Sequence, residues 1–470
     1  METQRSVSIT ENTSRRIGQA TLLLGRAASL CTLTLLSLSF SCKETPPEPP
    51  KPATISLKAE DASCTEAWLK ASASQFPTTV RLLRLDPTPQ TRQTLRLTTA
   101  DTLLIDEGLL PRRTYTYQLQ KLTNDSGIVE TSVAVQLTTM DTTSHAFQWT
   151  LDSVGTETSI LRDVAFVGDE IWTVGTINVM DSLGQLQRYN LAKWNRQGLQ
   201  LLRVQFSTIC GQSSTTPYPA KSIFAFNATD IWIAMYGDQV ARWNGTSQVA
   251  TMCMPLSFSI NKLWGHDPAA LYAVGDNGNV FRFDGTIWRR IESGTNVELT
   301  DVWGSPDGSV VWACGWKDFQ PTVLLKIVSG VCEKVYEDQT HLFSYRSDSL
   351  SGAIRSVWTN RNDKVYALSW YDLYDAPVST HGEARARWRG NPLTWVDWRI
   401  RGNAINDLVA AGYEARIWHF NGVAWKRFDN LVNPLDELLS VAIKDNMIVA
   451  VGWRYYNGIE NFGIIYRGRR

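Results

Sequence analysis

The chain has little of what usually builds a metal or redox site. It contains 5 histidines and 7 cysteines among 470 residues, and no two cysteines have the C-x-x-C spacing of zinc or redox motifs. Neither the phosphate-binding pattern G-x-x-x-x-G-K-[ST] nor the zinc-protease pattern H-E-x-x-H occurs. These absences exclude the commonest metal, nucleotide and redox motifs, and we expect no bound metal and no cofactor.

Net charge is also missing, because 46 Lys and Arg residues balance 46 Asp and Glu residues. A protein that binds nucleic acid normally carries a basic face, so this balance argues against a nucleic-acid partner. Apolar residues make up 43% of the chain and charged residues 20%, which is typical of a globular protein. Tryptophan is abundant instead, with 19 residues, and all but Trp68 lie at or after Trp149.

An apolar stretch near the N-terminus is too short to span a bilayer comfortably. It covers Ala28–Phe40 and follows a region, residues 1–27, that carries four arginines. This order is the layout of a signal peptide. The stretch ends in Leu38-Ser39-Phe40-Ser41-Cys42, which resembles the lipobox of bacterial lipoproteins, although Ser39 replaces the aliphatic residue that is commoner there.

The lipobox resemblance implies that residues 1–41 are removed and that Cys42 carries a lipid anchor. It places the protein in the bacterial cell envelope, attached to a membrane, and Lys43 rather than Asp after the cysteine favours the outer membrane. An ordinary signal peptide with an incidental cysteine is the alternative. Five prolines in residues 46–52 predict an extended stalk over residues 42–52. The other cysteines of the processed chain allow one or two disulfides in an oxidising envelope.

Residues 53–140 alternate apolar and polar residues in short runs that turn residues separate. Examples are Val80–Leu82, Thr94–Leu97, Tyr115–Leu119 and Val133–Leu137. Such period-two runs predict a small sandwich of two β-sheets.

A stretch inside this region resembles the fibronectin type III pattern that leads into one of that family's core strands. In Gly108–Tyr117, the residues Leu109, Pro111 and Tyr115 fall on the family's Leu, Pro and corner Tyr, whereas Arg112-Arg113 stands where the family has Gly-Thr. The resemblance implies a fibronectin type III-like domain, and we expect it to act as a spacer.

Residues 145–470 repeat a unit of four short strands. One copy consists of Ile260–Trp264, Leu271–Gly275, Val280–Phe283 and Ile287–Ile291. Asn-Gly and Asp-Gly pairs connect its strands and favour tight two-residue hairpins. Units of four strands at a spacing of about 40–50 residues indicate β-propeller blades. We therefore predict an all-β chain whose propeller has seven blades; six is the alternative, because the sixth unit has a poorly defined first strand.

The two ends of the repeat region predict a closed ring. The seventh unit lacks a fourth strand, and residues 146–151 alternate like a strand before the first unit. We expect this segment to pair into the last blade, which would remove the exposed edges of an open sheet. The repeats resemble a propeller pattern of bacterial envelope proteins, loosely "dvWavG…G…hydG…W", which is often found in lipoproteins. That resemblance implies a fold and no particular activity.

Two better-known propeller families fit less well. No unit closes with the Trp-Asp pair of WD40 repeats. Ser305–Trp312 is similar to the Asp-box of sialidases, but its Gly stands one place early and no second copy exists. We interpret it as a turn followed by a strand.

Most tryptophans of the repeats occupy strand positions and are expected to pack between blades. Other tryptophans follow the second strand, in units where the turn to the third strand is longer than in the repeat. Trp316, Trp370 and Trp453 stand directly after that strand. The candidate ligand-binding residues on this loop face are Trp316, Asp318, Phe319, Trp370, Tyr371, Asp372, Tyr374, Trp453, Tyr455 and Tyr456.

Insertions on one face are where repeat proteins usually bind, and aromatic side chains there can stack on sugars or anchor a partner protein. The first hypothesis is a binding or scaffolding protein that recognises a glycan or an envelope protein, with no catalytic residue assigned. The second is a glycan-active hydrolase or lyase that uses loop carboxylates such as Asp318 and Asp372. The third is a structural subunit of an envelope assembly.

Overall fold

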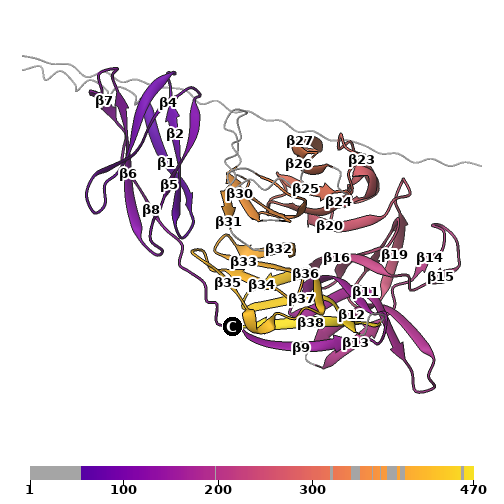
Figure 1. Ribbon diagram of the computed structural model, residues 1–470. Coiled ribbons are helices and arrows are strands. Elements are labelled where there is room, and N and C mark those ends of the chain that lie inside the picture. Colours follow the sequence, from indigo (N-terminus) through magenta and orange to yellow (C-terminus); the bar gives the residue numbers. More distant parts are fainter. Residues whose placement is uncertain are drawn as a thin grey trace, which may run out of the picture. The chain divides into compact units, whose positions relative to one another are not determined.

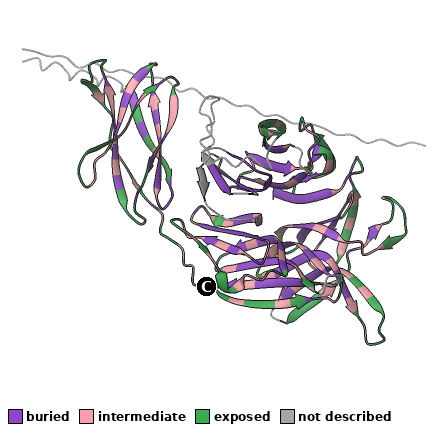
Figure 2. Cartoon of the chain, in the orientation of Figure 1, coloured by how far each residue is buried: buried purple, intermediate pink, exposed green. Residues whose placement is uncertain are grey.

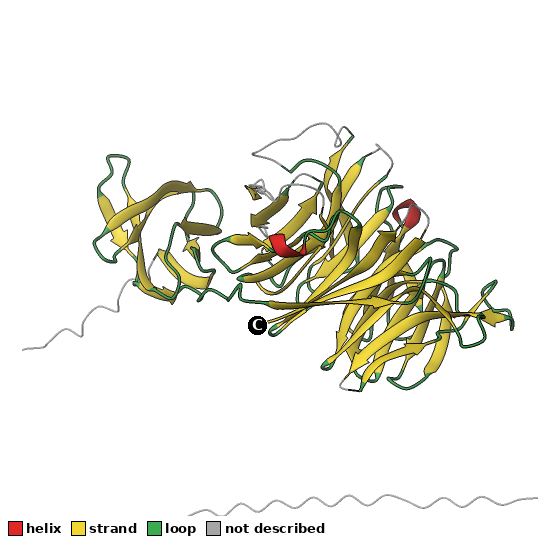
Figure 3. Ribbon diagram, turned by 60° about the horizontal axis from the view of Figure 1, so that its bottom comes forward, coloured by secondary structure: helices red, strands yellow, loops and turns green. Residues whose placement is uncertain are grey.

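The computed structural model describes residues 54–195, 197–317, 321–339, 350–362, 364–370, 372–377, 389–391, 397–456 and 460–470. The region of the predicted signal peptide, Cys42 and the stalk lies outside these residues. The described chain is built from β-strands, with two short 3-10 helices, η1 (Asp276–Gly278) and η2 (Asp429–Leu431) (Figures 1 and 3). None of its helices has the length and apolar character needed to cross a membrane.

The first part of the described chain forms two antiparallel sheets. One has the order β1-β2-β5, and the other has the order β4-β3-β6-β7 with β8 paired to β6. The strands are β1 (Ile55–Ala62), β2 (Glu66–Ala73), β3 (Thr78–Arg84), β4 (Gln90–Leu97), β5 (Asp101–Glu107), β6 (Thr114–Leu122), β7 (Ile128–Thr131) and β8 (Val135–Thr138).

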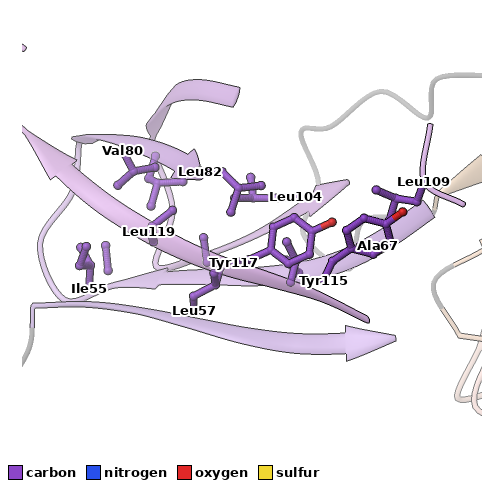
Figure 4. Close-up of a cluster of buried hydrophobic side chains, with 14 residues drawn as sticks. Ile55, Leu57, Ala67, Val80, Leu82, Leu104, Leu109, Tyr115, Tyr117 and Leu119 are labelled. Carbon is purple, nitrogen blue, oxygen red and sulfur yellow. The ribbon is translucent and has the colours of Figure 1, made fainter. Parts of the chain in front are cut away.

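Side chains from both sheets form a single apolar core, which includes Leu69, Val80, Leu82 and Leu119 (Figure 4). Alternate residues of each strand point into this core, which is why the period-two pattern predicts it. The hydroxyl oxygen of Tyr115 accepts a hydrogen bond from the backbone N–H of Leu110 at 2.9 Å. This bond fixes the loop that enters β6.

Within the described residues, the rest of the chain forms seven four-stranded antiparallel sheets. Sheets one to three consist of β10 (Ile160–Val167), β11 (Glu170–Met180), β12 (Leu186–Asn195) and β13 (Gly198–Leu202); β16 (Ala220–Asn227), β17 (Asp230–Met235), β18 (Gln239–Trp243) and β19 (Gln248–Cys253); and β20 (Ile260–Asp267), β21 (Ala270–Gly275), β22 (Val280–Phe283) and β23 (Trp288–Ile291). A small hairpin of β14 (Phe206–Ser207) and β15 (Thr215–Thr216) lies between the first two sheets in sequence.

Sheets four to seven follow the same plan. They consist of β24 (Leu299–Gly304), β25 (Val311–Trp316), β26 (Thr322–Val328) and β27 (Val331–Asp338); β28 (Ile354–Trp358), β29 (Lys364–Ser369), β30 (Leu373–Pro377) and β31 (Arg389–Asn391); β32 (Asp397–Ala404), β33 (Asp407–Gly412), β34 (Ile417–Phe420) and β35 (Trp425–Arg427); and β36 (Asp436–Lys444), β37 (Met447–Tyr456), β38 (Glu460–Arg469) and β9 (Gln148–Val154).

The first strands of the seven sheets contact one another in sequence order, and β36 contacts β10, so the sheets form a ring. These inner strands are largely buried (Figure 2). Tryptophans at the predicted strand positions are buried as well, including Trp172, Trp232, Trp312 and Trp358. The architecture is a β-propeller, as the repeat pattern predicts.

The last sheet takes its fourth strand from the beginning of the repeat region. β9 pairs antiparallel with β38, from Gln148 opposite Arg469 to Val154 opposite Gly463. The paired segment therefore starts two residues later and ends three residues later than the sequence pattern of residues 146–151 indicates. The disulfide Cys210–Cys253 ties the loop before β16 to the end of β19.

Each of the seven first strands contains a one-residue bulge at the same place in the unit. The extra residues are Arg162, Lys221, Asn261, Thr300, Arg355, Trp398 and Leu439. A bulge bends the strand and redirects neighbouring side chains. Repetition of the bulge places chemically different residues at equivalent points around the ring.

In several sheets a glycine of the second strand lies opposite the residue before the bulge. At Gly275, Gly315 and Gly452, an added Cβ would overlap with the carbonyl oxygen of the residue that precedes or begins the neighbouring first strand. Only a residue without a side chain tolerates so close an approach of two backbones. Met235 and Ser369 occupy the equivalent position in sheets two and five, which carry the same bulge. The glycine is therefore required by the close backbone approach within its own sheet, and not by the bulge alone.

Candidate ligand-binding face

One end of the ring carries a set of equivalent side chains. Each directly follows the residue of the second strand that pairs with the residue before the bulge, and three of them, Thr176, Trp316 and Trp453, still lie within β11, β25 and β37. Five of these seven residues are aromatic. The set is Thr176, Tyr236, Asp276, Trp316, Trp370, Tyr413 and Trp453. We call this set, together with the bulged residues next to it, the ring mouth.

Backbone hydrogen bonds hold the mouth residues in place. The N–H groups of Tyr236, Trp316 and Trp370 donate to the carbonyl oxygens of Pro219, Glu298 and Ala353, at 2.8, 3.1 and 2.9 Å. Each bond extends the pairing between the first two strands of a sheet by one step. The aromatic side chains are therefore fixed by rigid strands rather than by loops, which favours binding without rearrangement.

Below the mouth, charged side chains bridge the centre of the ring. Asp163 accepts hydrogen bonds from Lys262 Nζ at 2.5 Å and from the hydroxyls of Ser222 and Ser440 at 2.8 and 2.7 Å. Burial acts to raise the pKa of Asp163, but Lys262 and Arg399 outweigh it and lower that pKa. Burial lowers the pKa of Lys262 to about 8, although Asp163 opposes the shift.

A second carboxylate repeats this arrangement three sheets away. Asp301 forms ion pairs with Arg399 at 2.8 Å and Arg401 at 2.9 Å, and accepts a hydrogen bond from the Ser356 hydroxyl at 2.5 Å. Asp301 is fully buried, and its two arginines are at most 13% exposed at the side chain. Side chains therefore fill the centre of the ring at this level.

An arginine enclosed by tryptophans occupies one side of the mouth. The guanidinium carbon of Arg355 lies 3.7 Å from the ring centroid of Trp398, 4.2 Å from that of Trp370 and 5.4 Å from that of Trp316. Trp316 and Trp370 also contact each other edge to face, with centroids 6.5 Å apart. Arg355 is only 2% exposed, so this cluster supports the mouth and leaves other faces of the tryptophans for contact with a ligand.

Next to this cluster lies a cavity of about 480 Å³, which we call the aromatic cavity. Its lining residues are Trp370, Tyr413, Glu414, Arg416, Pro434, Leu435, Asp436, Glu437, Trp453 and Tyr455. Trp453 and Tyr455 contact each other with centroids 5.9 Å apart, and Tyr455 is 42% exposed. Aromatic walls with a few polar groups are typical of a recognition site.

The acidic residues of the aromatic cavity differ in their partners. Asp436 is buried and holds Arg454 through two bonds of 2.6 and 2.8 Å, while Glu414 pairs with Arg416. Burial raises the pKa of Glu437, while Trp398, Arg355 and Tyr413 act in the opposite direction. Glu437 is therefore the carboxyl of this cavity whose charged form burial disfavours.

The predicted site residues fall into three groups. Trp370, Trp453 and Tyr455 line the aromatic cavity, and Trp316 lies behind Trp370. Asp372 and Tyr374 are buried instead, because Tyr374 points into the core of its sheet and bonds to the Ser351 hydroxyl at 2.8 Å. Those two are inaccessible to a ligand, which corrects their placement on the loop face. Asp318, Phe319, Tyr371 and the side chain of Tyr456 lie outside the described residues, as does Cys42.

Sequence reasoning missed Arg355, Tyr413, Glu437 and Tyr236. Tyr236 and Tyr413 occupy the position equivalent to Trp316, but the turns after them are short, and the expected site included only units with expanded turns. Alignment of all units on the residue after the second strand would have found both. Arg355 is a bulged residue, and Glu437 lies two residues before the bulged Leu439. Neither position can be recognised from a hydrophobic pattern.

Histidines and carboxylates gather near the end of the chain without forming a metal site. His419 Nε2 lies 2.7 Å from Asp407 Oδ1, Arg470 pairs with Asp407 at 2.6 Å, and the Nδ1 atoms of His145 and His419 are 2.7 Å apart. Over the described ranges, no group of three or more His, Cys, Asp or Glu residues could hold a metal ion.

Fold and site together define a β-propeller protein with aromatic side chains gathered at the ring mouth. No protein-family model matches the chain, and no curated protein matches it. Solved structures similar to it include YCF48 bound to D1 peptide, at 12% identity and a TM-score of 0.48, covering 70% of this chain and 100% of that one. The propeller domain of Cps50 (Swd1) from Myceliophteria thermophila matches at 12% identity and 0.44, covering 67% and 99%. The designed protein Ika8 matches at 13% identity and 0.41, covering 66% and 98%.

Proposed function

We propose that this protein is a non-catalytic binding or scaffolding protein that recognises a partner protein or a glycan at the ring mouth. The aromatic cavity carries this proposal. Its volume of about 480 Å³ falls within the range of roughly 300–1,000 Å³ that is usual for ligand sites. Tryptophan and tyrosine are also the residues that most often dominate binding energy at interfaces.

The finer architecture belongs to the same proposal. The seven sheets are the blades of a seven-bladed propeller, and residues 53–140 are a fibronectin type III-like domain. The bond from Leu110 N–H to the Tyr115 hydroxyl supports the second point, since the corner tyrosine of such sandwiches bonds to the backbone a few residues upstream. A lipid on Cys42 and the proline-rich stalk would attach the folded part to the outer membrane.

Binding at the aromatic cavity can be tested with the full chain and a double variant, Trp370→Ala with Trp453→Ala. Both proteins are incubated with a panel of envelope polysaccharides and, separately, with envelope proteins immobilised one by one. We expect the double variant to lose at least tenfold in affinity for the ligand that the natural protein retains. Phe76→Ala is the matched control, because Phe76 is an exposed aromatic residue, at 53%, of the other sheet region.

The glycan-active alternative is tested in the same incubation by measuring released sugar. Glu437 is the acid it would need, because its raised pKa suits a proton donor. Sugar release that disappears in Glu437→Gln while retention persists would replace the binding proposal with an enzyme. Retention without release, lost in the double tryptophan variant alone, supports the binding protein. No retention of any sugar or envelope protein would overturn the proposed role of this cavity.

Membrane attachment is tested by Cys42→Ser. We expect this variant to appear in the soluble fraction after cell breakage and to lose incorporation of labelled fatty acid. Cys332→Ser is the control, since Cys332 forms no disulfide and stands far from the N-terminal region in sequence. Equal membrane retention of both variants would contradict the anchor.

A further inference from the structure

A second cavity of about 330 Å³ lies at the ring mouth and shares no residue with the aromatic cavity. We call it the basic cavity. It is lined by Lys221, Tyr236, Ser259, Asp276, Asn277, Glu298 and Lys317. These residues come from sheets two to four, whereas the aromatic cavity belongs to sheets five to seven.

Two cations share the ring of Tyr236: Lys221, which lines the cavity, and Arg162, which lies beside it and is not a lining residue. Lys221 Nζ lies 4.4 Å from the ring centroid, and the guanidinium carbon of Arg162 lies 5.3 Å from it. Arg162 and Lys221 are the bulged residues of the first two sheets, so the repeated bulge brings them side by side. Both side chains are half-buried, and burial lowers the pKa of each.

Glu298 and Asp276 act to raise the pKa of Lys221, but neither forms a direct ion pair with it among the described residues. In the part of the chain that the structure describes, no ion pair joins Arg162 or Lys221 to a carboxylate, and Arg162 Nε is buried without a hydrogen bond. The hydroxyl of Ser259, which lines the same cavity, is also buried and unbonded. Half-buried cations and polar atoms without partners carry a desolvation cost, and an anionic ligand would offset it.

The charge of the cavity limits which anion fits. Lys221, Lys317 and the adjacent Arg162 supply three positive charges, while Asp276 and Glu298 supply two negative ones. Glu298 is held on one side by the Asn261 amide at 2.9 Å. The small positive excess suits a singly charged group, because two nearby carboxylates would repel a dianion such as phosphate.

We propose that the basic cavity binds a side-chain or terminal carboxylate of an acidic peptide segment. Lys221 and Arg162 provide the charge, Ser259 provides a hydroxyl donor, and Tyr236 forms the wall against which the two cations are held. The site does not depend on the aromatic cavity, so a ligand can occupy either one alone.

The test measures binding of two short blocked peptides to the full chain by calorimetry at low ionic strength. The probes are acetyl-Gly-Glu-Gly-Glu-Gly-amide and the same peptide with glutamine for glutamate. We expect the acidic peptide to bind and the neutral one to bind at least tenfold more weakly. The double variant Arg162→Gln with Lys221→Gln should lose about tenfold or more for the acidic peptide, since it removes two charge-assisted donors.

Three further variants make the test independent of folding defects and of the aromatic cavity. Glu298→Gln should tighten binding of the acidic peptide severalfold, because it removes the opposing charge and leaves both cations. Lys193→Gln with Lys326→Gln is the matched control, since these lysines also lie over aromatic rings, those of Trp172 and Trp312, but in the outer part of their sheets. Trp453→Ala should leave binding unchanged, which separates this site from the proposed function.

Three outcomes would overturn the proposal. The first is equal binding of the acidic and neutral peptides. The second is an equal loss in the control double variant. The third is tight binding of inorganic phosphate without binding of the acidic peptide, which would assign the cavity to phosphate groups instead.

Discussion

Arg355 and Arg162 occupy the same position in two repeat units, but different side chains surround them. Both are the extra residue of a bulge at the ring mouth. Three tryptophans enclose Arg355, which is 2% exposed, whereas Arg162 is half-buried over one tyrosine that it shares with Lys221. The same backbone device thus produces a structural cation on one side of the mouth and a candidate binding cation on the other.

The carboxylates of the two cavities show a similar contrast. Glu298 and Glu437 both have backbone carbonyls that approach the glycine ending a second strand. Glu437 lies in a pocket of aromatic rings, where burial raises its pKa, while Glu298 stands among lysines. The repeat fixes the backbone position of each side chain, and the residues at the ring mouth determine which side chains surround it.

The largest effect expected from this comparison is on stability. Arg355→Met should lower the free energy of unfolding by about 2–3 kcal/mol, because the cation–aromatic contacts vanish and the polar groups around it lose a buried charge. Arg162→Met should change it by no more than about 0.5 kcal/mol. Urea unfolding followed by tryptophan fluorescence measures both. Equal losses would show that the two arginines play the same structural part.

The next effect should come from filling the space where the backbone of a first strand approaches the glycine of the second strand. Gly315→Ala and Gly452→Ala should each cost about 1–3 kcal/mol, because the new methyl group overlaps with a backbone carbonyl of the neighbouring strand. The same loss in both would confirm that the two sides of the mouth share one backbone geometry. Gly184→Ala is the control, since a Cβ there meets nothing and only the positive φ of 73° opposes it. A cost at Gly315 and Gly452 no greater than at Gly184 would argue against this close backbone approach.

The smallest effect concerns pH. A carboxyl whose pKa is raised on folding stabilises the protein below its ordinary value of 4.5 and loses that contribution as pH rises through the folded pKa. Glu437→Gln should therefore gain stability over the natural protein as pH rises from 4 towards 7, by on the order of 0.5 kcal/mol. Glu298→Gln, measured over the same pH series, corrects for the general loss of one negative charge. A gain that shrinks with rising pH would contradict the raised pKa.

Much of the fold follows from local patterns in the sequence. Alternating apolar residues and Asn-Gly or Asp-Gly turns mark strands and hairpins, so the four-strand units and the all-β architecture were predictable. The site was predictable only where bulky aromatic residues follow a strand, as at Trp316, Trp370 and Trp453. Tyr374 was misplaced because β30 begins at Leu373, within the stretch that the sequence assigns to an expanded loop.

The rest of the site depends on geometry between units. Arg162 and Lys221 lie 59 positions apart, and a shared tyrosine from a third place brings them together. A one-residue bulge changes the face on which a side chain emerges, and a periodic pattern read strand by strand does not register it. Such contacts become visible once the units are aligned on the residue that lies opposite the start of the bulge.

The pairing of β9 with β38 can form only when synthesis of the chain is nearly complete. About 300 residues separate Val154 from its partner Gly463, and at 5–20 residues per second the ribosome needs roughly 15–60 s to make them. During that interval β9 has no partner, because β38 has not yet been made, and an unpaired strand edge readily recruits other strands. Each nascent copy therefore exposes β9 to neighbouring copies until β38 is synthesised.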